Sequence, residues 1–313
     1  MRPVLAVFGR LALFGLLALV AGCAQPADDF DFDTCGVRPR VRIPVAMHGN
    51  VPLVLGSIKG IPAVFVLDTG ADSVVLTEGA IEKFDLATDR RVTYTGVGIG
   101  GSTRGFAGHL KDLRIGDLMV PDHRVRLLAA NSGIAGTGID GLFGVSVLSV
   151  FEVDLDLPNG LVTLYAGHLC PDTVAPEWAG SAVVMDASRS ERGRFTVPVT
   201  VDGHEFKALL DTGAALSLVS SEAAAAIGVS AAVLAGDPTA LLAGTGPGAT
   251  RAAVHRFGSI VIAGERFAGP ALAVTDLPDR GFDMIIGSDY LAHRHIWLSY
   301  ARRRAYIEPI GPR

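Results

Sequence analysis

The sequence predicts an all-β fold built from two pseudo-symmetric lobes with a few short helices. Glycine is abundant, at 38 of 313 residues, while aromatic residues make up 7% of the chain. This balance is typical of many short strands joined by tight turns, because glycine adopts the positive φ angles that such turns require. Almost half of the residues are hydrophobic, which excludes a disordered or collagen-like chain. An internal repeat then divides the chain into two lobes.

The charge of the chain limits its partners. The formal net charge is −5 at pH 7. Nucleic-acid binding depends on clustered lysines and arginines that neutralise phosphates. The arginine run at 302–304 is most simply a solvated turn between two late strands. Nucleic acid is therefore not expected as a partner.

The first 22 residues have the pattern of a signal peptide. Arg2 and Arg10 precede an apolar run at 11–20, and small residues then lead to Cys23. The run is too short for an uncleaved anchor, which needs about 20 residues to span a bilayer. The segment resembles a bacterial lipobox, which implies that Cys23 becomes the lipidated first residue of the mature chain. The alternative is an ordinary secretory peptide cut after Ala24, with a soluble product.

The lipobox reading predicts a location and a tether. Ala24 follows the cysteine, in place of the aspartate that retains such proteins in the inner membrane. We therefore expect a protein in the periplasm, anchored to the outer membrane by its lipid, with residues 23–43 as the tether.

The other two cysteines, Cys35 and Cys170, are candidates for a disulfide. An oxidising periplasm would permit the bond, and closing so long a loop stabilises a chain by roughly 5 kcal/mol in the chain-entropy model. Two buried free thiols are the alternative. There is no CxxC motif, and the histidines lack metal-ligand spacing, so neither a metal nor another cofactor is expected.

A repeat with an offset of 143 residues organises the remaining chain. The segment FVLDTGA at 65–71 returns as ALLDTGA at 208–214. Gly60 and Gly203 both lie eight residues before the aspartate, where a hairpin turn would join strands 51–58 and 63–67, and strands 195–201 and 206–210. Each half therefore enters its Asp-Thr-Gly sequence from a strand.

Later elements repeat with the same offset. Thr77 and Ser220 are suited to cap short helices at 78–86 and 222–227. The motifs LFG at 142–144 and IIG at 285–287 follow, and β-rich segments at 151–165 and 296–307 end each half. We expect lobes at 44–168 and 193–310, joined by a polar linker at 169–192 in which 182–185 could form a strand.

The duplicated motif predicts a pair of facing carboxylates. Asp68 and Asp211 each follow apolar strand residues and precede glycine, so each would be buried at the end of a strand at a cost in desolvation. If the two meet between the lobes, like charges about 3 Å apart cannot both ionise, and the pKa of one rises. One carboxyl group would then serve as a base and the other as an acid.

The segment LDTGADSVVL at 67–76 resembles the active-site loop of retropepsin-type aspartic proteases, and the apolar-apolar-Gly motifs are similar to that family's second signature. The resemblance covers nearly all of the mature chain. It implies pepsin-like or retropepsin-like β-barrel lobes with the active site between them, and an endopeptidase that acts on protein or peptide substrates. Because both copies lie in one chain, we expect a monomer.

The resemblance also assigns roles to residues of the two loops. Asp68 and Asp211 would share a proton and hold the water that attacks the peptide bond. Thr69 and Thr212 would exchange hydroxyl-to-backbone hydrogen bonds across the lobe junction. Gly70 and Gly213 would let the loops approach the substrate backbone, and the loop-supporting residues that follow are Ala71 and Ala214.

Two departures from the pattern separate the lobes from each other and from pepsin. The second loop has Ala215 where the first has Asp72, so that substrate polarity would be read on one side of the cleft. The tyrosine of pepsin-type flaps has no clear counterpart, which favours the retropepsin branch.

A glycine-rich segment fits a flap better than a nucleotide site. Residues 96–101 satisfy G-x-G-x-x-G, but no strand-to-helix context surrounds them. We interpret 94–106 as a flap hairpin, with a counterpart around 244–248; two ordinary loops are the alternative. The predicted substrate-binding residues are Gly98, Ile99, Gly100, Gly101, Thr245 and Gly246.

Three functional classes follow. The leading one is an active aspartic endopeptidase, and the second is a catalytically silent lipoprotein that binds or scaffolds peptides. Both intact aspartates favour the first, because a pure binder has little reason to keep two repelling carboxylates. Other hydrolase chemistry on a β scaffold is the third class, but the serines lack a G-x-S-x-G elbow.

Overall fold

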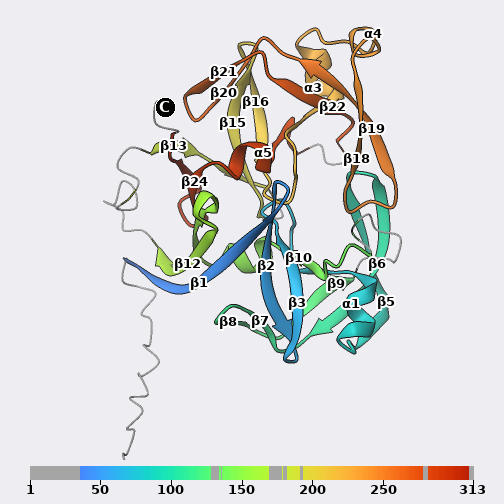
Figure 1. The fold of residues 1–313 in the computed structure, drawn as a ribbon, viewed down its shortest axis with the longest axis vertical. Helices are drawn as coiled ribbons and strands as arrows, with labels where there is room; N and C mark the ends of the chain where they lie inside the picture. The colour runs from blue at the N-terminus through green and yellow to red at the C-terminus, as the bar shows by residue number, and fades with distance from the viewer. Residues whose placement is uncertain are drawn as a thin grey trace, which may run out of the picture. The chain divides into compact units, whose positions relative to one another are not determined.

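The computed structural model describes residues 36–127, 134, 136–168, 178, 182–190, 193–277 and 281–309 (Figure 1). Within these residues the strands form one sheet of 15 strands and another of 10, accompanied by five short α-helices. The expectation of an all-β fold with short helices is confirmed. In the same part of the chain, no helix combines the length and the apolar character needed to cross a membrane.

The first half of the chain supplies the larger sheet. Its strands are β1 (Gly36–His48), β2 (Val51–Ile58), β3 (Ile61–Leu67), β4 (Val75–Leu76), β5 (Thr88–Gly98), β6 (Gly101–Leu110), β7 (Leu113–Ile115), β8 (Leu118–Val120), β9 (His123–Leu127), β10 (Gly141–Phe143), β11 (Glu152–Asp156) and β12 (Leu161–His168). Its helices are α1 (Glu78–Lys83), α2 (Val145–Leu148) and the 3₁₀ turn η1 (Leu157–Asn159).

The second half supplies the smaller sheet and completes the larger one. Its strands are β13 (Val183–Asp186), β14 (Ser188–Arg189), β15 (Phe195–Val201), β16 (His204–Leu210), β17 (Leu218–Ser220), β18 (Thr239–Ala243), β19 (Ala249–Arg256), β20 (Ser259–Ile262), β21 (Glu265–Ala268), β22 (Ala271–Thr275), β23 (Met284–Ile286), β24 (His295–Ser299) and β25 (Arg304–Ile307). Its helices are α3 (Ser221–Ala226), α4 (Ala231–Leu234) and α5 (Ser288–Leu291).

The hairpins that lead to the two Asp-Thr-Gly sequences turn at equivalent residues. In the β2–β3 turn, Lys59 and Gly60 have φ angles of 50° and 77°; in the β15–β16 turn, Asp202 and Gly203 have φ angles of 48° and 84°. Two consecutive positive φ angles characterise the type I′ turn, whose twist matches that of the flanking strands. The turn therefore sets the register of each strand that ends at an aspartate.

Each lobe places a later strand between the two strands that flank its aspartate. In the first lobe β10 pairs in parallel with β3 and antiparallel with β4. In the second lobe β23 lies in the same way between β16 and β17. Because β10 separates β3 from β4, residues 68–74 must cross the end of the sheet. Residues 211–217 do the same in the second lobe.

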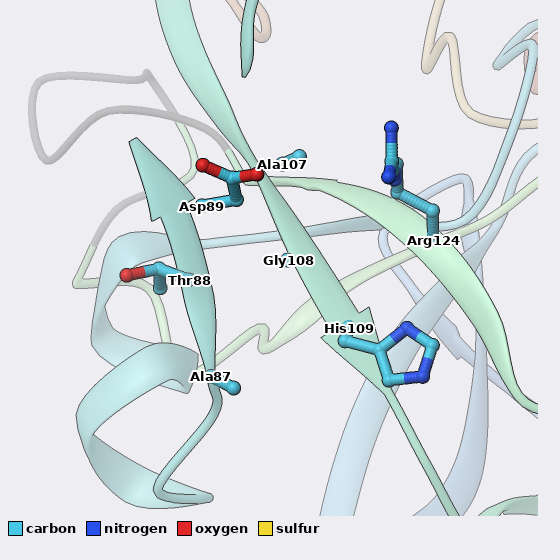
Figure 2. A pocket seen from close by; sticks show the side chains of 7 residues that line it. All are labelled: Ala87, Thr88, Asp89, Ala107, Gly108, His109 and Arg124. Carbon is cyan, nitrogen blue, oxygen red and sulfur yellow. The ribbon is translucent and has the colours of Figure 1, made fainter. Parts of the chain in front are cut away.

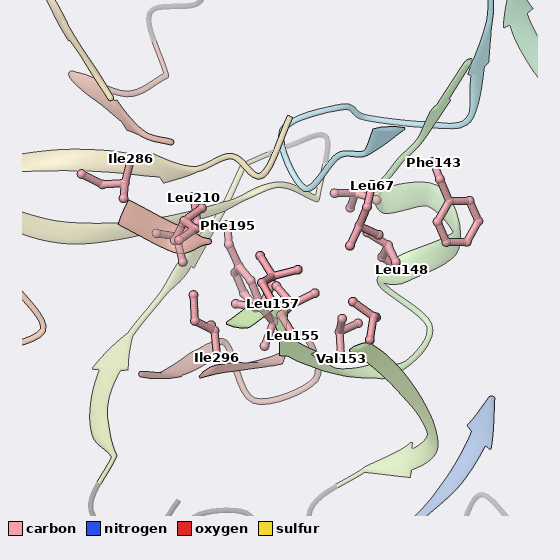
Figure 3. Packing of buried hydrophobic residues seen from close by; sticks show 14 of the residues in the cluster. Leu67, Phe143, Leu148, Val153, Leu155, Leu157, Phe195, Leu210, Ile286 and Ile296 are labelled. Carbon is pink, nitrogen blue, oxygen red and sulfur yellow. The ribbon is translucent and has the colours of Figure 1, made fainter. Parts of the chain in front are cut away.

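A six-stranded layer joins the lobes beneath the two loops. Its order is β13-β25-β24-β11-β12-β1, and β11 of the first half pairs antiparallel with β24 of the second. Val153 and Leu155 of β11 are buried in one core with Leu67 and Leu210, the residues that precede the two aspartates (Figure 3). Burying each such side chain contributes roughly 1.5–3 kcal/mol. This shared core therefore supports both loops from below.

Polar side chains link β11 and β24 on the opposite face of this layer. The carboxylate of Glu152 is buried and accepts hydrogen bonds from the Trp297 indole (2.7 Å) and the Ser299 hydroxyl (2.9 Å). His295 lies 2.6 Å from Asp154. Burial by itself would lower the pKa of His295, but the hydrogen bond and charge of Asp154 outweigh burial and raise it. The lobes are therefore joined by paired side chains as well as by backbone hydrogen bonds.

Some boundaries differ from those expected. Residues 36–43, expected in the tether, begin β1 and pair with β12, because alternate residues such as Val41 and Ile43 are buried against the core. The linker contributes β13 and β14, with β13 extending one residue past the expected strand. Helix α1 ends at Lys83 and not at residue 86, since Asp85 adopts a positive φ angle of 47°.

Candidate active site

The two Asp-Thr-Gly loops meet between the lobes. Asp68 follows β3, and its amide donates to the carbonyl of Phe143 on β10 (3.1 Å). Asp211 follows β16, and its amide donates to the carbonyl of Ile286 on β23 (3.0 Å). The neighbouring strand therefore holds the first residue of each loop. This explains why the apolar-apolar-Gly motifs accompany the aspartates in the sequence.

The threonines lock the loops to each other. The Thr69 hydroxyl donates to the carbonyl of Leu210 (2.8 Å) and accepts from the amide of Thr212 (3.0 Å). The Thr212 hydroxyl donates to the carbonyl of Leu67 (2.6 Å) and accepts from the amide of Thr69 (3.1 Å). Both threonines are about 1% exposed. These four reciprocal bonds fix the distance between the two loops.

Each aspartate is held by the amides of its own loop. Oδ1 of Asp68 accepts from Gly70 (2.9 Å) and Ala71 (2.8 Å). Oδ1 of Asp211 accepts from Gly213 (2.9 Å) and Ala214 (3.1 Å). One oxygen of each carboxyl group is thereby fixed.

The glycines make room for the opposite carboxyl group. A Cβ atom placed on Gly70 would overlap the carboxyl group of Asp211, and one on Gly213 would overlap that of Asp68. The two carboxyl groups are also close enough to hydrogen bond to each other. Any side chain at either glycine would force the pair apart.

The pKa values of both carboxyl groups are raised. Burial and then the negative charge of Asp211 raise the pKa of Asp68 well above its usual range. Burial also raises the pKa of Asp211, but the amides of Gly213 and Ala214, the Asp68 hydroxyl and the charge of Arg194 oppose that rise. The amides of Gly70 and Ala71 oppose the rise at Asp68 in the same way, so the two aspartates are described as a pair that shares one proton.

The glycine-rich segment forms a hairpin that reaches the other lobe. The tip between β5 and β6 contacts the loop after β18: the amide of Gly246 donates to the carbonyl of Ile99 (2.9 Å), and the amide of Gly248 donates to that of Gly100 (3.1 Å). Cβ atoms on Gly98 and Gly100 would overlap Thr245 and Gly248. Gly101 begins β6 with a φ angle of 110°. The six residues predicted for the flaps therefore lie at one contact between the lobes.

Apolar side chains form equivalent clusters in the two lobes beside the loops. The first-lobe cluster contains Val66, Val75 and Leu142, with Ala71 packed against it. The second-lobe cluster contains Leu209, Leu218 and Ile285 at the equivalent positions, with Ala214 packed against it. Ile99 of the flap tip also packs against the second cluster, so the flap reaches the surroundings of the Asp211 loop.

The two arginines that pair with Asp72 beside the first loop were not predicted from the sequence. Asp72 forms ion pairs with Arg126 on β9 (3.2 Å) and with Arg194, just before β15 (3.2 Å). Arg194 comes from the second half of the chain, and its side chain is 11% exposed. Asp72 itself was singled out because its counterpart is Ala215. Its partners lie 54 and 122 residues away, and no local pattern marks them.

The structure does not describe the three cysteines that were predicted as site residues. Cys23, Cys35 and Cys170 lie outside the described residues, so the lipid site and the disulfide stay predictions. No group of three or more histidine, cysteine, aspartate or glutamate side chains that could hold a metal ion occurs in the described ranges.

Comparison with known proteins identifies the family. A family model described as aspartyl protease matches the chain twice, over residues 54–147 and 197–290, which together span more than half of the sequence. Each matched stretch contains one Asp-Thr-Gly loop and one apolar-apolar-Gly motif. No curated protein matches the chain. The chain therefore belongs to the aspartyl protease family, as a retropepsin-like protein that carries the family's domain twice.

Proposed function

We propose that this protein is an aspartic endopeptidase that hydrolyses peptide bonds in extended protein segments. The observation that carries the proposal is the arrangement of Asp68 and Asp211. Two buried carboxyl groups face each other, and reciprocal threonine hydrogen bonds and loop amides hold them there. Such an arrangement destabilises the folded chain, because like charges repel and burial disfavours ionisation, and a chemical use of the pair accounts for its presence.

In the proposed reaction Asp68 carries the shared proton and Asp211 carries the negative charge. Ionised Asp211 accepts a proton from a water molecule held between the pair, and the resulting nucleophile attacks the scissile carbonyl carbon. Asp68 donates its proton to the carbonyl oxygen, so that a neutral tetrahedral intermediate forms. Collapse of that intermediate breaks the C–N bond: Asp211 delivers the proton it took up to the leaving amine, and Asp68 takes back a proton from a hydroxyl group of the intermediate, which restores the pair.

A screen of the purified protein against a peptide library tests the activity itself. Cleavage products identified by mass spectrometry would support the endopeptidase. If peptides bind without being cleaved at any pH from 3 to 8, the silent peptide-binding class is favoured instead.

The pH profile depends on the residue after each Asp-Thr-Gly. A serine or threonine there could donate a hydroxyl to the ionised pair and lower its pKa values, but Ala71 and Ala214 lack that donor. Because burial already raises both pKa values, we expect the kcat/KM of the native protein to peak at about pH 5 to 7. The double variant Ala71→Ser, Ala214→Ser should shift the profile towards acid. A native optimum below about pH 4 would contradict this explanation.

We also propose that the protein acts in the periplasm as a lipoprotein of the outer membrane. The support is the sequence of residues 1–23, with its apolar run and Cys23 after small residues. The mature protein is then expected in the membrane fraction, with a lipid on Cys23 that mass spectrometry detects. The Cys23→Ser variant should be released or left unprocessed. Soluble wild-type protein without lipid would favour the ordinary secretory peptide.

A further inference from the structure

Three charged residues near the first Asp-Thr-Gly loop have alanine at the equivalent positions of the second half. Arg126 of β9 pairs in register with Val75, and the equivalent strand pair in the second lobe sets Ala273 opposite Leu218. Asp72 has Ala215 as its counterpart. Two residues before Arg126 stands Arg124, and its counterpart is Ala271. At these three positions the first half has a charged residue and the second half has alanine.

Arg126 connects the cleft with a groove on the outside of the first lobe. It contacts Asp72 in the active-site loop, and its neighbour across the β6–β9 pair is Ala107. Ala107 and Gly108 line a groove of about 240 Å³. Figure 2 shows the side chains of His109 and Arg124 along the strands that bound this groove. Arg126, Arg124 and His109, together with Ala107 and Gly108, are called the basic strip below.

The carboxylates near the basic strip are already paired with arginines. Asp72 faces both Arg126 and Arg194. Asp89, which lines the groove, accepts from the Arg91 guanidinium (3.0 Å) and also lies near the charge of Arg124. The guanidinium groups of Arg91, Arg124, Arg126 and Arg194 therefore outnumber the carboxylates of Asp72 and Asp89, although the whole chain carries −5 at pH 7.

The positions of Arg124 and Arg126 suit an extended chain. Arg124 and Arg126 are two residues apart on β9 and both face the groove side of the sheet, as does Ala107 across the pair. Residues i and i+2 of a strand lie about 7 Å apart, which is also the spacing of alternate side chains in an extended peptide. The Arg126 guanidinium is partly exposed and packs over the ring of Tyr94 on the flap strand β5.

We propose that the basic strip is an extended substrate subsite that binds acidic side chains, aspartate or glutamate, on one flank of the scissile bond. This inference rests on the proposed function, because the occupant is a polypeptide that leaves the cleft past Asp72. The second lobe has alanines in place of Arg124 and Arg126, and Arg256 beside Ala271 donates to the Gly269 carbonyl, so the other flank gains less from acidic residues. The strip thereby makes the cleft sensitive to the direction of the substrate chain.

Binding to a full-length Asp68→Asn protein tests the subsite without requiring turnover. Three fluorescent peptides share a cleavable centre found in the library screen, or an apolar centre if none is found. One carries two glutamates at alternate positions on the amino-terminal flank, one carries them on the carboxy-terminal flank, and one has glutamine at all four positions. Fluorescence polarisation at low and at physiological salt gives the Kd of each peptide.

One acidic peptide should bind about 3- to 10-fold more tightly than the glutamine peptide, as expected for two exposed ion pairs. The gain should shrink at higher salt. Adding Arg124→Gln should reduce it by about 2- to 5-fold, whereas Arg266→Gln, at an exposed arginine of β21 in the second lobe, should leave it unchanged. Kinetics of the wild-type protein should show the same preference in kcat/KM.

The outcomes separate this inference from the proposed function. The subsite would be overturned if all three peptides bound with equal affinity or if both acidic peptides gained affinity equally. It would also be overturned if neither acidic peptide bound, or if the gain in affinity persisted in the Arg124→Gln variant. If the wild-type protein cleaves peptides without preferring acidic ones, the endopeptidase proposal is supported and the subsite proposal is rejected. If acidic peptides bind more tightly but no peptide is cleaved, the subsite proposal is supported and the endopeptidase proposal is rejected.

Discussion

Replacing either Asp68 or Asp211 with asparagine is expected to abolish peptide cleavage while leaving the fold intact. Asparagine keeps the Oδ1 acceptor that the loop amides require, so each loop stays in place. It cannot share or exchange the proton, and general acid-base catalysis typically contributes 10²- to 10⁴-fold in rate. We expect kcat/KM to fall by about this factor or more in each single variant.

Stability should move little, or rise, in the same two variants. Each substitution replaces one buried carboxyl group with a neutral amide of the same shape, and in Asp211→Asn the remaining Asp68 no longer faces a negative charge. The melting temperature measured beside the kinetics therefore separates lost chemistry from lost structure. Asp117→Asn, at an exposed residue between β7 and β8, is the matched control and should retain full activity. Near-native turnover in either dyad variant would refute the shared-proton mechanism.

The sequence predicted the parts of the fold that depend on local or repeated patterns. The type I′ turns at Gly60 and Gly203 need glycine. A strand can be recognised within a few residues of sequence, because its residues either alternate between apolar and polar or are continuously apolar. The offset between the repeats then implied that whatever surrounds Asp68 also surrounds Asp211. The structure brings these two residues together with the threonines and glycines that the family resemblance assigned.

Contacts between distant segments could not be predicted in the same way. Arg194 meets Asp72 across the lobe junction, and nothing near either residue indicates the pair. The pairing of β11 with β24 could not be predicted either, because the hydrophobic pattern of each strand fits any apolar partner strand. Residues 36–43 were included in the expected tether, although Val41 and Ile43 face the core. These contacts depend on partners that only the folded chain supplies.

Replacing Thr69 with valine should destabilise the protein strongly. Valine fills the same space, but it cannot donate to the carbonyl of Leu210 or accept from the amide of Thr212, and both bonds are buried. Leaving a buried polar group without a partner costs about 1–3 kcal/mol, so the free energy of unfolding should fall by about 2–6 kcal/mol. Denaturant titration of the wild-type and variant proteins measures this change.

Thr69→Ser is the control that separates the hydroxyl from the methyl group. Serine keeps both hydrogen bonds and loses one buried methyl, which should cost about 1 kcal/mol. Because the Thr212 hydroxyl accepts from the amide of Thr69 in return, Thr212→Val should show a loss of similar size. If valine at position 69 cost no more than serine, the reciprocal bonds would not be what holds the loops together. The spacing of Asp68 and Asp211 would then have to come from the shared core beneath them, where Leu67 and Leu210 pack against β11.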